Sequence, residues 1–110
     1  MKHSPHIVRT ALTVLALSAG IQTGAHALTA SELHTRTTAA MCANCHGTEG
    51  RTIDGSAIPS LVGMPKEYMV RQLKSFKDGS RPATVMHQIT KGLTDEQVET
   101  ISTYYSTLKR

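Results

Sequence analysis

The chain has 110 residues, enough for one small domain, and its formal net charge is +4. Its basic residues form no dense stripe with interleaved aromatic residues, which excludes a typical nucleic-acid-binding domain. With three tyrosines, one phenylalanine and no tryptophan, its side chains can form only a small apolar core. We therefore expect a disulfide, a metal or a large cofactor to complete that core.

The first 27 residues have the parts of a secretory signal peptide. Lys2 and Arg9 make the start basic, the apolar run TALTVLALSAGI follows, and the triplet AHA ends at Ala27 with the small residues that a signal peptidase reads. The alternatives are an N-terminal membrane anchor or an amphipathic helix, but the run is too short to span a bilayer as a helix. We expect cleavage of residues 1–27 and export of residues 28–110 to the periplasm, with no membrane span left.

A first helix is predicted at the start of the exported domain. Thr29 and Glu32 form a capping box, and Leu28 and Leu33 stand at the positions of a hydrophobic staple. The helix is predicted to run through HTRTTAAMCANCH and to end at Gly47, because glycine tolerates the left-handed conformation that terminates helices.

The next segment, GTEGRTIDGSAIPSLVG, is interrupted by glycine and proline and is predicted to be a loop. A second helix is predicted from Pro65, a favoured first helical position. Met69, Leu73 and Phe76 recur on one face of it, with Tyr68 beside them, and the sequence DGSRP ends it.

The segment ATVMHQI, residues 83–89, is expected to be an irregular apolar turn. A last helix is predicted to begin at a second capping box, formed by Thr94 and Gln97. Its apolar residues recur at helical spacing: Val98, Ile101, Tyr105 and Leu108. Because no segment alternates as a strand does, we predict an all-α fold in a single domain, residues 28–110.

The only two cysteines, Cys42 and Cys45, stand three residues apart, and His46 follows directly. A disulfide would close a loop too small to restrain the unfolded chain much, and a redox dithiol is typical of a βαβ unit. Structural zinc takes four ligands, so His34 or His87 would have to complete the set. Covalent haem attachment uses every residue of the motif, with two thioethers and His46 as the proximal iron ligand.

A second axial ligand would come from the other methionines and histidines: Met41, Met64, Met69, Met86, His34 and His87. Met86 is the residue that we favour, because about 40 residues separate it from His46 and allow the chain to pass around the porphyrin. Met69 lies on the apolar face of a predicted helix, where methionine is usually core filler. His87 is the rival and would give a bis-histidine haem.

With these motifs the sequence resembles a class I c-type cytochrome. The resemblance rests on CANCHG, IPSLVG, YMVRQLKSFKDGSRP, TVMHQI and LTDEQVETISTYYSTL. Within that class, SFKDGSRPATVMHQITKGLTDEQ is similar to the haem domain of the cytochrome subunit of flavocytochrome c sulfide dehydrogenase. Many such subunits carry two haem domains, whereas this chain has one C-x-x-C-H motif. The resemblance implies a class I cytochrome c fold, with three main helices and loops wrapped around one covalent haem.

The resemblance also implies a set of site residues. Cys42 and Cys45 would hold the haem, and His46 and Met86 would bind its iron. The carbonyl of Pro59 would accept the imidazole N–H and orient the ring. Pocket-lining residues would be Tyr68, Leu73, Phe76 and Val85, and Arg81 would neutralise a haem propionate or remain a solvated loop charge. Ala39 would meet Tyr104 where the first and last helices cross.

A haem iron with both axial positions filled transfers electrons and binds no substrate, so we expect an electron-transfer protein that is not an enzyme by itself. The resemblance implies a flavoprotein partner, with FAD, in a sulfide dehydrogenase complex. The alternatives are a free soluble carrier to a terminal oxidase or another redox partner, and a haem enzyme or sensor with an open distal site served by His87. The expected docking surface carries Lys66, Arg71, Lys74, Lys77 and Arg81, unless these form only a solvated helix face.

Overall fold

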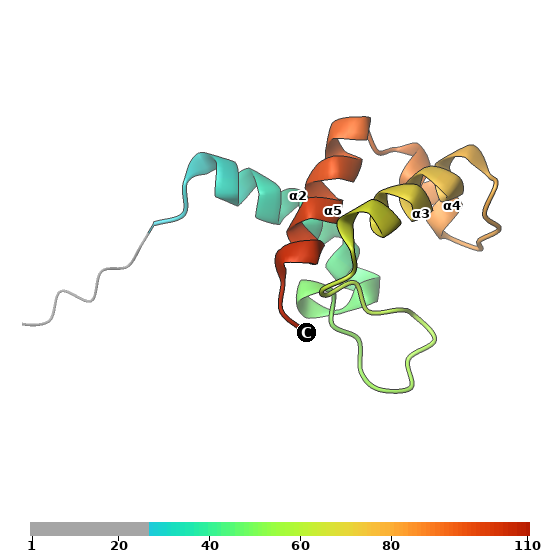
Figure 1. The fold of residues 1–110 in the computed structure, drawn as a ribbon, viewed down its shortest axis with the longest axis horizontal. Helices are drawn as coiled ribbons and strands as arrows, with labels where there is room; N and C mark the ends of the chain where they lie inside the picture. Colours follow the sequence, from blue (N-terminus) through green and yellow to red (C-terminus); the bar gives the residue numbers. More distant parts are fainter. Residues whose placement is uncertain (1–26) are drawn as a thin grey trace, which may run out of the picture.

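Four α-helices and a short 3-10 helix make up the described part of the chain, residues 27–110 of a computed structural model (Figure 1). They follow in the order α2 (Ala30–His46), η1 (Thr48–Gly50), α3 (Lys66–Asp78), α4 (Met86–Lys91) and α5 (Asp95–Thr107). No strand occurs between residues 27 and 110, and the predicted all-α fold is confirmed. The predicted signal peptide lies outside the described residues, apart from Ala27.

Both predicted capping boxes are present. At the start of α2, the Thr29 hydroxyl accepts the Glu32 backbone N–H at 3.2 Å, and the Glu32 carboxylate accepts the Thr29 backbone N–H at 2.8 Å. Thr94 and Gln97 repeat this arrangement at the start of α5. These reciprocal bonds satisfy backbone donors that the first turn of a helix leaves without partners.

The segment around Met86 differs from the prediction. Instead of an irregular turn, it forms α4, a helix of six residues, which within residues 27–110 is added to the three main helices that were expected. The Thr90 hydroxyl donates to the Met86 carbonyl at 2.8 Å within this helix. Because so short a helix has little stability of its own, its contacts with α3 must supply the rest.

The hydrophobic core lies where α5 crosses α2 and packs against α3 (Figure 1). It consists of Ala39, Met69, Val70, Leu73, Leu93, Val98, Ile101 and Tyr105. At the crossing, the hydroxyl of Tyr105 donates to the Ala39 carbonyl, beside Tyr104, the residue expected to meet Ala39. Tyr104 is half-buried and meets the Tyr105 ring edge-on, with 5.1 Å between centroids.

Among residues 27–110, no helix is both long and apolar enough to cross a membrane.

Candidate functional site

The C-x-x-C-H motif occupies the last turn of α2. Residues three apart on a helix are neighbours, so Cys42 and Cys45 present their side chains from adjacent positions of one turn. Cys42 is half-buried and packs against the core, whereas Cys45 is exposed, and both thiols are free. His46 ends the helix and is 8% exposed. The motif therefore presents two available thiols directly beside a buried imidazole.

One hydrogen bond determines which nitrogen of His46 is available. Its Nδ1 lies 2.7 Å from the carbonyl oxygen of Pro59. Because a carbonyl oxygen only accepts, Nδ1 must carry the hydrogen, and the lone pair for a metal is on Nε2. The Pro59 carbonyl thus fixes both the tautomer and the orientation of the ring, as a partner behind a metal-binding histidine does.

Gly47 lets the chain reverse directly after His46. Its φ is +80°, and a Cβ there would lie 2.0 Å from the carbonyl oxygen of Arg51. No other residue fits this close backbone approach. The glycine after the motif therefore ends α2 and allows the following loop to fold back to Pro59.

Cys42 lacks the thiolate character of a redox or zinc site. Burial, together with the neighbouring Cys45, raises the pKa of Cys42 to about 11, so its thiol stays protonated at neutral pH. Reactive and metal-binding cysteines are instead thiolates with lowered pKa values. Moreover, residues 27–110 contain no group of three or more His, Cys, Asp or Glu side chains that could hold a metal ion. The protein's own side chains thus favour neither alternative.

The methionines lie in different environments. Met86 is the first residue of α4, half-buried, and packs against the core. Met69 is 3% exposed inside the core, and Met64 is partly buried against it. Met41 is 43% exposed on α2. These positions agree with Met69 as core filler, and they leave Met86 and Met64 as the half-buried methionines outside the C-x-x-C-H helix.

The two rival histidines also differ. His34 is exposed on α2. His87 is half-buried, and its Nε2 lies 3.0 Å from the Gln88 amide nitrogen. Since that amide nitrogen donates, Nε2 accepts and Nδ1 carries the hydrogen of the His87 ring. This Nδ1 is buried and has no hydrogen-bond partner among the described residues.

The expected lining residues divide into buried and exposed ones. Leu73 belongs to the core at 7% exposure, and Phe76 is half-buried. Tyr68 and Val85 are 43% and 55% exposed. The Arg81 guanidinium lies 4.5 Å from the centroid of the Phe76 ring and donates to the Gln72 side chain, so it has partners within the protein.

Two further apolar residues, Ile53 and Ile58, are 84% and 41% exposed in the loop between η1 and α3. Sequence reasoning missed them, because an isoleucine in a loop carries no periodic signal. Like Tyr68 and Val85, these two residues leave apolar surface open to a ligand or partner. Together with two free thiols and an imidazole with its Nε2 available, they fit a large apolar cofactor such as haem.

Two contacts around α4 were missed, one of Thr90 and one of Lys77, which was expected only on the docking surface. Thr90 is fully buried and bonds the Met86 carbonyl, and Lys77 donates to the carbonyl of Leu93. Thr90 follows Met86 by four residues, which is a helical spacing, but an irregular turn was expected for this segment. The contact of Lys77 had no signal in the sequence.

Comparisons with known proteins bear on this site. A family model described as cytochrome C oxidase, cbb3-type, subunit III, matches residues 30–104, which include the C-x-x-C-H motif, Met86 and most of α5. The matched region therefore extends from the first helix to the last.

Individual relatives are cytochromes and electron acceptors. The chain is 44% identical over 69 residues to the cytochrome subunit of sulfide dehydrogenase of Chlorobaculum tepidum. The aligned region makes up 63% of this chain and 61% of that protein. It is 42% identical over 71 residues to the thiosulfate dehydrogenase electron acceptor of Thiomonas intermedia, covering 64% of this chain and only 33% of that protein. It is 35% identical over 68 residues to cytochrome c-554(548) of Halomonas halodenitrificans, covering 59% of this chain and 81% of that protein.

Proposed function

The chain belongs to the cytochrome c family described as cytochrome C oxidase, cbb3-type, subunit III, and on this basis we propose that it carries single electrons between redox proteins. Membership implies a covalently bound haem c, which supplies the one-electron redox chemistry. The relatives are cytochromes that accept electrons or serve as subunits, so the chain is not an enzyme by itself.

In this proposal Cys42 and Cys45 form the thioethers, His46 is the proximal ligand and Met86 is the distal one. The observation that carries it is the hydrogen bond from His46 Nδ1 to the Pro59 carbonyl, which leaves Nε2 for the iron at the end of a C-x-x-C-H helix. Ligation by the His46 nitrogen and the Met86 sulfur would fill both axial positions of the iron, and the methionine sulfur would raise the reduction potential relative to a second nitrogen ligand.

Carbon monoxide tests whether the iron is closed. Optical spectra of the reduced protein are recorded with and without the gas. A carrier with His46 and Met86 bound keeps its spectrum, because no position is open for the gas. Rapid binding would instead identify a haem enzyme or sensor with an open distal site and would overturn the proposed ligand pair.

The proposed partner is a flavoprotein that oxidises sulfide at FAD and passes electrons singly to this haem in the periplasm. The similarity to a cytochrome subunit of sulfide dehydrogenase supports it. That similarity spans 61% of the relative, so the same domain would also suit a free carrier. The two arrangements differ in their interfaces, since a permanent subunit uses a large apolar contact and a diffusing carrier a smaller, charge-steered one.

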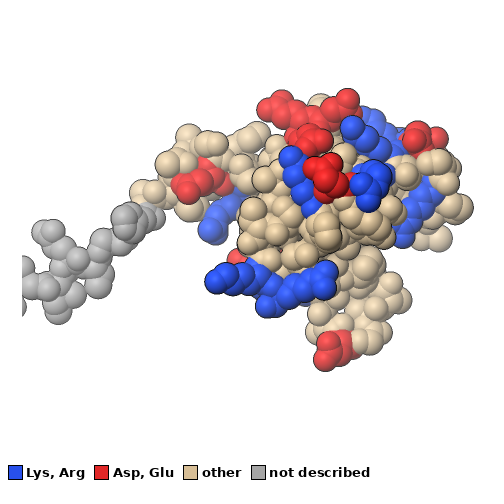
Figure 2. Space-filling view, viewed as in Figure 1, with Lys and Arg blue, Asp and Glu red and all other residues tan. Residues whose placement is uncertain are grey.

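Some of the basic residues expected on the docking surface have partners within the protein, which leaves fewer of them for docking. Lys66 forms an ion pair with Glu99 at 2.9 Å, and Lys77 bonds the chain between α4 and α5. Arg71 and Lys74 are exposed and form no salt bridge within the described residues. Figure 2 shows basic side chains, interspersed with acidic ones, on the part of the molecule that holds α3 and α4. We therefore assign charge steering to Arg71 and Lys74.

The response to ionic strength distinguishes a permanent subunit from a free carrier. The protein is purified from its native host at low and at several-fold higher ionic strength. A bound flavoprotein that survives both supports the subunit. A lone monohaem protein whose electron-transfer rate falls with salt, and falls less steeply in Arg71→Gln/Lys74→Gln, identifies the carrier and removes the subunit proposal.

A further inference from the structure

The helix that begins with Met86 depends on contacts outside itself. α4 has only six residues, and an isolated helix of that length is unstable in water. Val85, just before it, is 55% exposed and packs little against the rest of the protein. The position of Met86 therefore depends on its own contact with the core and on what holds the interior and the far end of α4.

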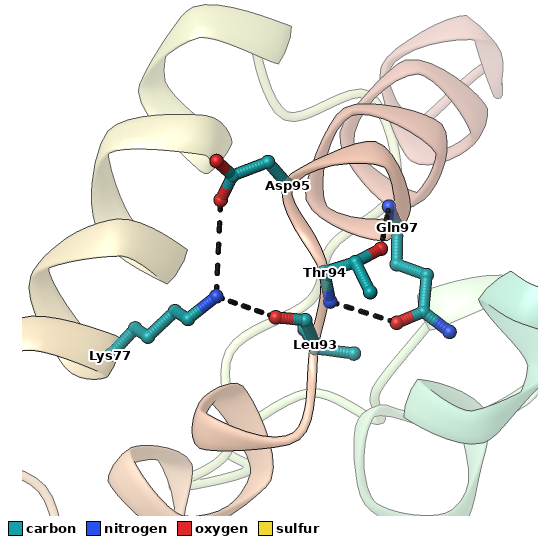
Figure 3. Close-up of polar contacts among 5 residues, drawn as sticks. All are labelled: Lys77, Leu93, Thr94, Asp95 and Gln97. Atoms are coloured by element: carbon teal, nitrogen blue, oxygen red, sulfur yellow. Dashed lines mark hydrogen bonds and ion pairs between the residues drawn. The ribbon is translucent and has the colours of Figure 1, made fainter.

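Lys77, in the last turn of α3, holds the far end (Figure 3). Its Nζ donates to the carbonyl oxygen of Leu93 at 2.6 Å and lies 3.8 Å from the Asp95 carboxylate. The Asp95 side chain is 84% exposed, so this ion pair contributes little. The bond to Leu93 is the stronger contact, because it joins a charged donor to the backbone of a residue that is only 6% exposed.

Leu93 needs a partner from outside the helices. It lies between α4 and α5, so its carbonyl belongs to neither hydrogen-bond ladder, while its own N–H bonds the Thr90 carbonyl at 3.1 Å. Thr90 in turn is fully buried and bonds the carbonyl of Met86. A continuous series of bonds thus leads from Lys77 through Leu93 and Thr90 to the backbone of Met86.

We propose that Lys77 is a positioning residue that keeps Met86 in place, and that it is not part of the docking surface. This inference rests on the proposed role of Met86 as the distal ligand. Without the bond from Lys77, the Leu93 carbonyl loses its protein partner, and α4 separates from α3 more often while the rest of the fold persists. The distal ligand is then displaced more readily.

Imidazole, a neutral iron ligand, measures this opening in the oxidised haem protein. It binds only when Met86 has left, so its apparent affinity scales with the fraction of molecules in which α4 is open. In Lys77→Met, which removes the donor and keeps an unbranched chain, we expect the apparent affinity to rise about tenfold. Lys77→Arg keeps a donor and should restore most of the wild-type value.

Two control variants distinguish the positioning role of Lys77 from general effects of charge and stability. Lys74→Met removes the same charge from the same helix, but Lys74 is exposed and forms no salt bridge within residues 27–110. Lys66→Met breaks the ion pair with Glu99, which joins α3 to α5 and does not touch α4. Urea unfolding followed by far-UV circular dichroism gives the global stability of each variant. Both controls should bind imidazole with the affinity of the wild type, even where their free energy of unfolding is lower.

Thr90 provides an independent variant. Thr90→Val removes the bond to the Met86 carbonyl and should also strengthen imidazole binding, whereas Thr90→Ser keeps the hydroxyl and should not. Lys77→Met protein that binds imidazole no more tightly than Lys74→Met overturns the inference. The ligand assignment is checked separately by the near-infrared sulfur-to-iron charge-transfer band of the wild type, whose absence would refute Met86 ligation itself.

Discussion

The hydroxyl of Tyr105 donates a hydrogen bond of 2.8 Å to the carbonyl oxygen of Ala39, 66 residues earlier in the chain. Both residues are buried, at 1% and 0% exposure, where α5 crosses α2. Burial raises the pKa of Tyr105 above its ordinary value, so the phenol stays protonated and remains a donor at neutral pH. The bond therefore links the helix of the C-x-x-C-H motif to the last helix.

Removing this hydroxyl in Tyr105→Phe is expected to lower the free energy of unfolding by about 1 kcal/mol, the net worth of a buried hydrogen bond. Urea unfolding of the haem protein measures the loss. The control is Tyr104→Phe, because Tyr104 is half-buried and its hydroxyl forms no hydrogen bond within the described residues. Equal losses in the two variants would show that the bond to Ala39 contributes nothing specific.

Alanine substitutions at Gly50 and Gly55 distinguish the cost of backbone strain from the cost of overpacking. Both have positive φ, at +72° and +78°, but a Cβ on Gly50 would lie 2.7 Å from the Tyr105 ring, whereas nothing lies within 4 Å of one on Gly55. Gly55→Ala should cost about 1 kcal/mol from the left-handed conformation alone. Gly50→Ala should cost roughly 1–3 kcal/mol more, because the added methyl overpacks the site. Thermal unfolding gives both values, and similar losses would refute the packing argument.

Loss of either thioether should leave little folded protein. The apolar core is small, and in Cys42→Ala or Cys45→Ala the haem is held less tightly and stabilises the fold less. The yield of haem protein and its thermal unfolding by circular dichroism are the measurements, with Met41→Ala as a neighbouring exposed control. A cooperative unfolding transition in haem-free Cys42→Ala would mean that the side chains alone suffice.

Replacing Met86 should open the iron and lower the reduction potential. In Met86→Ala the sulfur-to-iron charge-transfer band of the oxidised protein is expected to disappear. Met64→Ala and Met69→Ala should keep that band, although Met69→Ala, at a core position, should destabilise the fold by about 2–5 kcal/mol. Persistence of the band in Met86→Ala would assign the ligand to another residue.

The stabilisation that the capping box of α2 provides should be lost when acid protonates Glu32. The backbone N–H and the hydroxyl of Thr29 donate to Glu32, which lowers the pKa of Glu32 below its ordinary value of 4.5. The folded-state pKa lies below the unfolded one, so the ionised carboxylate stabilises the fold above the unfolded pKa, and this contribution is lost as the pH falls through the folded pKa. Gln97 in the box of α5 cannot titrate.

Nuclear magnetic resonance of the Glu32 carboxyl carbon tests this. Its midpoint is expected below 4.5, and Thr29→Val, which removes the hydroxyl and keeps the backbone N–H, should raise it part of the way. An unchanged midpoint in Thr29→Val would show that the hydroxyl does not stabilise the carboxylate.

Local signals carried most of the fold and the centre of the candidate site. The two capping boxes, Gly47 after His46 and the apolar faces of α3 and α5 could be predicted because the interactions behind them act within about four residues of the chain. The C-x-x-C-H motif is equally local, since its chemistry depends on neighbours within one helical turn. These features are readable before any tertiary contact is known.

Tertiary structure decided the features that depend on distant partners. α4 was predicted as a turn because six residues give a weak periodic signal. It is held by contacts with α3 and by the bond of Lys77 to Leu93, which lies just beyond the end of α4 and 16 residues from Lys77. The hydrogen bond of Tyr105 to Ala39 likewise depends on how α2 and α5 cross, because the two residues are 66 positions apart. The crossing and the docking of α4 are set by how the folded helices pack, and no pattern confined to a single helix reports that packing.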